Sequence, residues 1–145
     1  MSRGSVHITS TKLDASPEIK PNYLSTEEDK KVAAESIRLT RRIVRCDALK
    51  GYEPDEYKPG KEFVSDTDLV VAAGNIGTTI FHPVGTCKMG SENDELAVLD
   101  SQLRVRGVKG LRVADASAMP TITSGNTAAP TMLIAETLAE ILQKL

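Results

Sequence analysis

The residues with most capacity for chemistry lie in segment 81–90, Phe-His-Pro-Val-Gly-Thr-Cys-Lys-Met-Gly. Its proline and two glycines disfavour a regular helix or a central strand, so the sequence predicts a shaped loop that presents His82. Imidazole changes charge near neutral pH, and the chain contains only two histidines. His82 is therefore the first candidate for proton transfer, although a loop histidine can equally be a satisfied structural residue.

Two more conformationally special spots follow along the chain. Asp115 lies in Ala-Asp-Ala-Ser after a short β pattern, where its simplest role is to cap a turn. Asn126 and Thr127 come just before a C-terminal helical pattern, where their simplest role is to cap the helix. From the residue types alone, both the structural and the functional interpretation stay open at each position.

Several other kinds of site are poor fits to this sequence. There is no Cys-x-x-Cys, no histidine pair at helical spacing and no glycine-rich phosphate loop after a strand. Ser124 is followed by glycine but lacks the Gly-x-Ser-x-Gly context of a nucleophile elbow. We therefore expect neither a metal site nor a serine hydrolase.

Composition narrows the class of protein further. A chain of 145 residues that is 40% hydrophobic and 26% charged has the usage of a globular domain. A net charge of -2 gives no reason to expect nucleic acid as a partner. The longest apolar run, residues 69–73, is far shorter than the roughly 20 residues of a transmembrane helix, and the start has no signal-peptide pattern. With Cys46 and Cys87 expected as free thiols, we predict a soluble, cytoplasmic chain with no transmembrane segment.

The first half of the chain has the periodicity of two helices preceded by a strand. The sequence predicts a strand over 4–10, a loop over 11–24, an amphipathic helix over about 25–47, a loop over 50–64 and a helix from 65 or 66 to near 78. Ser25 and Glu28 form the pattern of a capping box. His7 falls on the polar side of the strand, and the arginines of the long helix fit a solvated face.

After the loop that contains His82, the pattern is mostly irregular. Two short β patterns over 103–105 and 111–113 are separated by a glycine-containing turn, and segment 114–125 is irregular. A helical stripe then runs from about residue 126 to the end.

Taken together, the motifs from residue 81 onward resemble those of one enzyme family. The quoted motifs are His82 to Gly90, Val98-Leu99-Asp100, residues 103–108, residues 111–120, Gly125-Asn126, Ala129-Pro130-Thr131 and Ile134-Ala135-Glu136, with Pro21 to Leu24 as an earlier match. In order and spacing they are similar to the C-terminal region of the glucose–methanol–choline (GMC) oxidoreductases. The choline dehydrogenase and alcohol dehydrogenase branch is the most similar.

This resemblance implies a flavoenzyme. The expected function is oxidation of a primary alcohol, choline-like or other, to an aldehyde by hydride transfer to FAD. His82 matches the family's active-site base, and Asn126 matches the second catalytic position, where an amide can donate to the substrate oxygen but cannot take its proton. Asp115, Ala116, Asn126 and Thr127 match positions that contact FAD, Thr127 through its backbone N–H.

The resemblance also implies an α+β architecture with two parts. Residues 1–80 are expected to form part of an antiparallel substrate-domain sheet with flanking helices. Residues 81–145 are expected to carry the active-site loop, with a C-terminal strand and helix that complete an FAD-binding domain.

Family enzymes hold the FAD pyrophosphate with an N-terminal Gly-x-Gly-x-x-Gly loop, which this chain lacks. We therefore expect an N-terminal FAD-binding region to be missing from this sequence. Two alternatives remain: a non-catalytic remnant that does not bind FAD by itself, and a family member acting as a hydroxynitrile lyase. Asn126 in place of a second histidine argues against the lyase.

Overall fold

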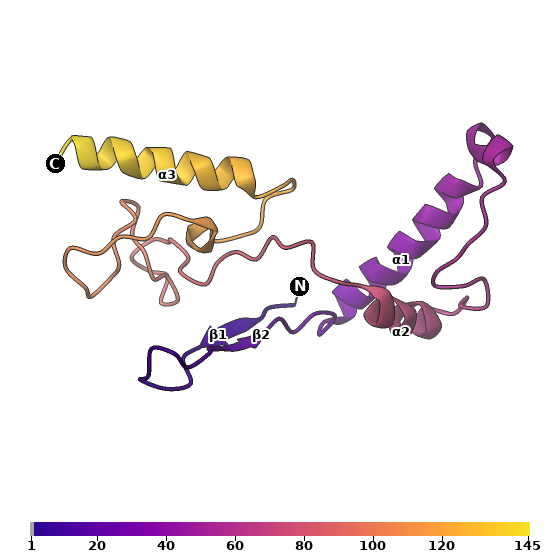
Figure 1. The fold of residues 1–145 in the computed structure, drawn as a ribbon, viewed down its shortest axis with the longest axis horizontal. Coiled ribbons are helices and arrows are strands. Elements are labelled where there is room, and N and C mark those ends of the chain that lie inside the picture. Colours follow the sequence, from indigo (N-terminus) through magenta and orange to yellow (C-terminus); the bar gives the residue numbers. More distant parts are fainter. Residues whose placement is uncertain (1) are drawn as a thin grey trace. The chain divides into compact units, whose positions relative to one another are not determined.

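The computed structural model describes residues 2–145, which fall into two units that divide between Thr78 and Thr79. Figure 1 labels the strands and two helices of the first unit and the long helix of the second. The fold class is α+β, with helices and a single two-stranded antiparallel sheet in the part of the chain that the structure describes. The predicted roles of these parts in a substrate domain and an FAD-binding domain stay predictions.

A short β-hairpin begins the first unit. Strand β1 (Ser5–His7) pairs antiparallel with β2 (Glu18–Lys20), and Val6 lies opposite Ile19. The first strand and the exposed position of His7 are confirmed, but the loop predicted over 11–24 is wrong where it contains β2. Three residues between two prolines are too few to give a period-2 signal, so only the pairing itself reveals this strand.

Helix α1 (Glu27–Val44) is the longest element, and its N-cap lies one residue later than predicted. Thr26, not Ser25, is the N-cap, and its hydroxyl accepts a hydrogen bond from the N–H of Asp29. Acidic residues fill the first turn, where the helix dipole favours negative charge. After α1 comes the 3-10 helix η1 (Asp47–Tyr52), the last three residues of which the sequence predicted as loop.

The basic side of α1 is more than the solvated face that the sequence predicted. The guanidinium of Arg41 contacts both carboxylate oxygens of Glu56, at 2.9 Å from Nε and 2.6 Å from Nη2. It also donates to the carbonyl oxygens of Gly60 and Phe63. The side chains of Arg41 and Glu56 are only 17% and 16% exposed, so this ion pair ties the loop after η1 to the helix.

Helix α2 (Asp66–Ile76) packs against α1, and the buried residues of the first unit come from these two helices, Ala34 from α1. Ser65 is its N-cap, as predicted, and accepts a hydrogen bond from the N–H of Asp68. Leu69 and Ala72 are buried on one face. The helix ends at Ile76 with Gly77 as its C-cap, close to the predicted end near residue 78.

The second unit is built mainly from irregular chain packed beside one helix. Helix α3 (Ala128–Gln143) is drawn in yellow in Figure 1, and the 3-10 helix η2 (Ala116–Ala118) precedes it. Leu99, Leu103 and Ala118 form the core of this unit, and Ile134 and Leu138 of α3 pack against it. The C-terminal helix is therefore confirmed, with its apolar stripe on the core.

The two β patterns at 103–105 and 111–113 do not form strands in the structure. They meet only at the isolated antiparallel bridge between Arg104 and Arg112. Leu103 has a positive φ of 60°, and Asp100 Oδ1 accepts hydrogen bonds from the N–H groups of Gln102 and Arg104. This local turn prevents the extended backbone that a longer ladder needs.

Among residues 2–145, no helix combines the length and the apolar character needed to cross a bilayer. Cys46 and Cys87 are free thiols in the structure. The cytoplasmic location stays a prediction.

Candidate functional site

The loop around His82 is held in place by backbone contacts with the segment around η2. The N–H of Cys87 donates to the carbonyl of Ser117 at 3.0 Å, and the N–H of Met89 donates to that of Ala118 at 2.9 Å. Gly85 has a φ of 88°, which other residues rarely adopt. The sequence therefore predicted an irregular loop correctly, and the structure shows which bonds shape it.

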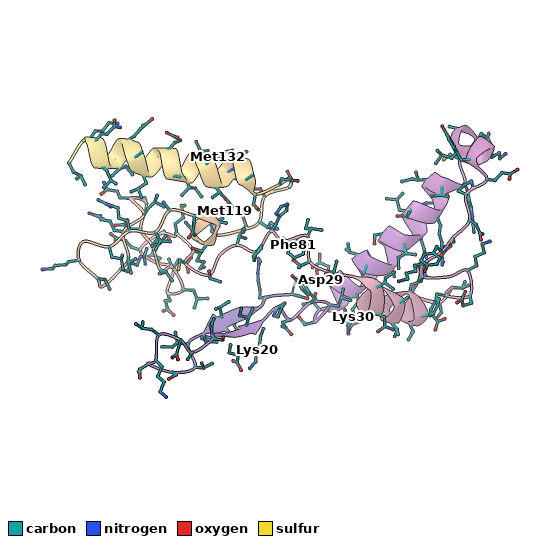
Figure 2. The ribbon with its side chains drawn as sticks, in the orientation of Figure 1. Lys20, Asp29, Lys30, Phe81, Met119 and Met132 are labelled. Atoms are coloured by element: carbon teal, nitrogen blue, oxygen red, sulfur yellow. The ribbon has the colours of Figure 1, made fainter. Side chains whose placement is uncertain are left out.

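The chain turns sharply at the point where it presents His82. Phe81 has a positive φ of 63°, a left-handed conformation that is uncommon for a bulky side chain. Pro83 follows at once and fixes its own φ. Figure 2 labels Phe81 next to this position and Met119 immediately after η2. His82 itself is partly buried.

The structure brings His82 to Thr127, 45 residues further along the chain. Nδ1 of His82 lies 3.2 Å from Oγ1 of Thr127, a hydrogen bond in which either atom can donate according to the tautomer of the ring. Thr127 is 8% exposed. The sequence had assigned Thr127 a cap or a backbone contact, and its side-chain contact with His82 was not predicted.

Asn126 lies directly before this contact, and it is not the cap of the last helix. Of the two predicted cap residues, Thr127 is the N-cap of α3, and the helix begins at Ala128, two residues after the predicted start. Asn126 is exposed, and its amide has no hydrogen-bond partner within residues 2–145. The side chain is thus available to donate to another molecule.

Asp115 does cap a turn, as its structural interpretation predicted. It is the N-cap of η2, and its Oδ1 accepts hydrogen bonds from the N–H of Ser117, at 2.8 Å, and from the Ser117 hydroxyl. Ala116 is the first residue of η2. The loop of His82 is hydrogen-bonded to the carbonyls of Ser117 and Ala118. Asp115 and Ala116 therefore belong to the segment that anchors the loop.

The N-terminus of α3 adds a partial positive charge next to Thr127. The first bond of the helical ladder runs from the N–H of Thr131 to the carbonyl of Thr127 at 3.0 Å. The N–H groups of Ala128 and Ala129 therefore have no acceptor within the helix, and Pro130 has no N–H. Such an end favours an electronegative group.

The C-terminal end of the His82 loop, at Gly90, is held by an arginine side chain whose contact the sequence did not predict. Arg106 donates to the carbonyl oxygens of Gly90 and Ser91, each at 2.8 Å. Nearby, the Lys88 ammonium lies 2.7 Å from the carboxylate of Asp94 and holds the pKa of Asp94 below its ordinary value. These contacts have no sequence signal beyond the presence of the charges.

The structure therefore joins His82, Thr127 and Asn126 at one end of α3, and it attaches Asp115 and Ala116 to the same loop through η2. Within residues 2–145, no group of three His, Cys, Asp or Glu side chains could hold a metal ion. The arrangement offers one imidazole, one free amide and a set of backbone donors, which suits hydrogen bonding to a small polar group.

Comparison with curated proteins gives long matches to one kind of enzyme. The chain is 43% identical over 97% of its length to oxygen-dependent choline dehydrogenase 1 of Chromohalobacter salexigens, of which it covers 25%. It is 42% identical over 96% of its length to oxygen-dependent choline dehydrogenase of Photobacterium profundum, of which it covers 24%. The chain thus spans about a quarter of the length of these relatives.

Solved structures give matches of similar extent. Pyridoxine 4-oxidase from Mesorbium loti matches with a TM-score of 0.82 and 33% identity, over 98% of this chain and 27% of that one. An FAD-dependent oxidoreductase from Chaetomium thermophilum matches with a TM-score of 0.89 and 30% identity, over 97% of this chain and 24% of that one.

A family model described as GMC oxidoreductase matches residues 1–135, which is nearly the whole chain. The resemblance inferred from the motifs around His82, Asp115 and Asn126 is thereby confirmed at the level of the family. The chain belongs to the GMC oxidoreductase family.

Proposed function

We propose that this chain is the C-terminal part of an FAD-dependent oxidoreductase that oxidises a primary alcohol, such as choline, to the aldehyde. The contact between His82 Nδ1 and Thr127 Oγ1 carries the proposal, because it engages one ring nitrogen and leaves Nε2 for the substrate. The matched choline dehydrogenases support an alcohol as the substrate class.

The residues present fit a flavin. When bound, FAD supplies the acceptor for the hydride of the alcohol. The N–H groups at the start of α3, with that of Thr127, form a donor set that suits the electronegative pyrimidine edge of the ring system. Asp115 and Ala116 would contact the cofactor from η2, and Asn126 from the residue before the helix.

His82 is the residue that takes the proton in this proposal. An alcohol must lose its hydroxyl proton as its carbon gives up hydride, and a neutral imidazole can accept that proton. The Asn126 amide has donors but no basic site, so it can only stabilise the developing alkoxide by donating to its oxygen. The base role therefore falls to Nε2 of His82.

Because the chain covers about a quarter of its relatives and has no Gly-x-Gly-x-x-Gly loop, we place the pyrophosphate site on a separate N-terminal region. In this proposal residues 1–80 contribute to the substrate-binding domain, and residues 81–145 complete the FAD-binding domain. The polypeptide that contains both regions is called the complete polypeptide below.

Two measurements test the proposed function. The complete polypeptide, purified and mixed with choline or a simple primary alcohol without oxygen, should lose the visible absorption of oxidised flavin as aldehyde forms. Flavin that stays oxidised with every primary alcohol would contradict the proposal. The 145-residue chain purified by itself should be colourless, and stoichiometric FAD on it would contradict the separate N-terminal region.

A further inference from the structure

We infer that Thr127 is a positioning residue for His82, whose hydroxyl accepts a hydrogen bond from Nδ1–H and so keeps the lone pair of Nε2 free. The inference rests on the proposed function, in which Nε2 takes the proton of the alcohol. It assigns the side chain of Thr127 a role separate from its backbone N–H. It also names the tautomer of His82 that the site holds.

The first support is that α3 does not use the Thr127 hydroxyl. Thr127 stands at the N-cap, where a threonine side chain ordinarily accepts an N–H of the first turn, yet it makes no such bond. Its φ of -80° and ψ of -6° are helical, whereas a capping residue is usually extended. By contrast, Thr26 and Ser65 at the starts of α1 and α2 are extended, and both side chains cap.

The second support is that the Thr127 hydroxyl is buried and directed to the ring. Within residues 2–145, Thr127 is the one polar or charged residue that is buried, and its Oγ1 lies 3.2 Å from His82 Nδ1. Its carbonyl is held from the other side by the N–H of Thr131, at 3.0 Å, and by the Thr131 hydroxyl, at 2.6 Å. The backbone of Thr127 is thus fixed at its carbonyl, while its hydroxyl contacts His82.

The backbone of the His82 loop is also held in place, which is the third support. The loop of His82 is bonded to η2 through Cys87 and Met89, and Pro83 restricts the backbone immediately after the ring. The backbone that carries the ring is therefore held by contacts within the chain. A single hydrogen bond at Nδ1 is then sufficient to set the ring's orientation.

The Nδ1–H tautomer is the one that a base at Nε2 requires, because the base needs a free lone pair on that nitrogen. A hydroxyl oxygen can accept from Nδ1–H both when the ring is neutral and after Nε2 has taken a proton, so the same bond lasts through the transfer. In the other neutral tautomer Nε2 already carries hydrogen and has no lone pair for the alcohol. In that state the Thr127 hydroxyl would donate to Nδ1, and this bond would have to reverse when the ring becomes charged.

Nitrogen NMR of the chain tests the tautomer without flavin or substrate. Histidine is labelled with 15N, and His7→Gln removes the signals of the other imidazole. At alkaline pH, where the ring is neutral, the expected spectrum has the shift of a protonated nitrogen at Nδ1 and of a bare nitrogen at Nε2. Histidine free in water favours the opposite tautomer, so this result would be a property of the contact.

Thr127→Val replaces the hydroxyl by a methyl group of similar size, and we expect it to shift the population toward Nε2–H. Thr127→Ser keeps the hydroxyl and should restore the Nδ1–H tautomer. The matched control is Thr123→Val, because Thr123 is an exposed neighbour whose hydroxyl donates to the Gly125 carbonyl at 3.1 Å and not to the ring. That variant should leave the tautomer population unchanged.

Two results would overturn the inference. One is a wild-type ring that is mainly Nε2–H, and the other is a Thr127→Val ring whose tautomer population equals that of wild type. Far-ultraviolet circular dichroism checks that α3 is intact, and Thr127→Ala gives a second variant without the hydroxyl if valine crowds the ring. An Nδ1–H ring in a protein that oxidises no alcohol would contradict the proposed function and leave this inference standing.

Discussion

The two units of this chain are fixed by different kinds of interaction. Residues 2–78 are organised by regular elements: a hairpin, two packed helices and the Arg41–Glu56 pair that ties a loop to α1. Residues 79–145 are organised by isolated bridges and backbone hydrogen bonds around Leu99, Leu103 and Ala118. The candidate site lies wholly in this second, irregular unit.

The candidate residues thus lie in the segments of the chain that have no regular secondary structure. His82 is presented from a left-handed turn at Phe81, and the loop is then closed by single hydrogen bonds to η2. Left-handed residues of this kind persist only where the surrounding structure determines them, and they often gather at functional sites. The first unit also has left-handed non-glycine residues, at Asn22, Leu24 and Glu53, but these lie in the connections between its helices and strands.

Leu99→Ala should have the largest effect on stability and should separate the units most clearly. Leu99 is fully buried in the second unit, and Leu69 is fully buried in the first, so Leu69→Ala is the matched change. Each should lower the free energy of unfolding by about 2–5 kcal/mol through lost burial and a cavity. Hydrogen exchange should show lost protection after Leu99→Ala in 79–145 and after Leu69→Ala in 2–78. Equal loss throughout the chain with either variant would contradict the division.

Arg41→Ala should have the next largest effect on stability, confined to the first unit. The substitution leaves the Glu56 carboxylate largely buried without its partner and also frees the Gly60 and Phe63 carbonyls. We expect a loss of about 1–3 kcal/mol in urea unfolding. The control is Arg42→Ala, an exposed arginine one residue along α1, which should change stability by less than about 0.5 kcal/mol. Similar losses in both variants would mean that the helix, not the ion pair, determines the effect.

Thr127→Val in the complete polypeptide should slow flavin reduction by alcohol on the order of 10-fold. A change of this size corresponds to the loss of the net free energy of one hydrogen bond. The loss should appear at saturating alcohol, because the hydroxyl acts on His82 and not on substrate affinity. Thr127→Ser should recover most of the rate. A valine variant with the wild-type rate would show that the second unit holds His82 by its backbone alone.

The smallest expected effect on stability is its decrease at acidic pH, where the carboxylates of the ion pairs become protonated. Both units contain such ion pairs. Hydrogen bonding from Arg41 lowers the pKa of Glu56, and hydrogen bonding from Lys88 lowers the pKa of Asp94. A carboxyl whose pKa is lower in the folded than in the unfolded chain stabilises the fold above its unfolded pKa. That stabilisation is lost as the pH falls through the folded pKa. The urea midpoint should thus fall on acidification from about pH 5, the upper edge of the unfolded carboxyl range.

Glu56→Gln should reduce this pH dependence, while it lowers the midpoint at neutral pH. Gln has no proton to gain, so the contribution of position 56 becomes independent of pH. A Glu56→Gln variant with the full wild-type slope below pH 5 would show that other carboxyls carry the effect.

The regular unit was the easier one to predict from sequence. Periodicity located α1 and α2, because amphipathic helices repeat their apolar positions. The N-cap of α2 was predicted correctly, whereas that of α1 was off by one residue and its end, at Val44, by about three. The hairpin strand β2 and the Arg41–Glu56 pair were missed, since each depends on a partner distant in sequence. Charges on a helix give no signal for which of them finds a buried partner.

The irregular unit shows the opposite pattern. Its strands were predicted wrongly, because the turn at Asp100–Arg104 and the positive φ of Leu103 have no periodic signature. The sequence singled out His82, Asp115 and Asn126 as candidates, because their residue types stand out in irregular segments, and their roles stay predictions. What the sequence could not reveal is the Thr127–His82 contact, which joins residues 45 positions apart.

The most direct test of the account is the rate of flavin reduction in the complete polypeptide after His82→Ala, measured by stopped-flow absorbance without oxygen. His7→Ala is the control, because His7 is exposed on the hairpin of the other unit. If His82 takes the proton of the alcohol, its loss should slow reduction by about 10²-fold or more, while the control stays at the wild-type rate. A His82→Ala enzyme that reduces its flavin as fast as wild type would contradict the central claim.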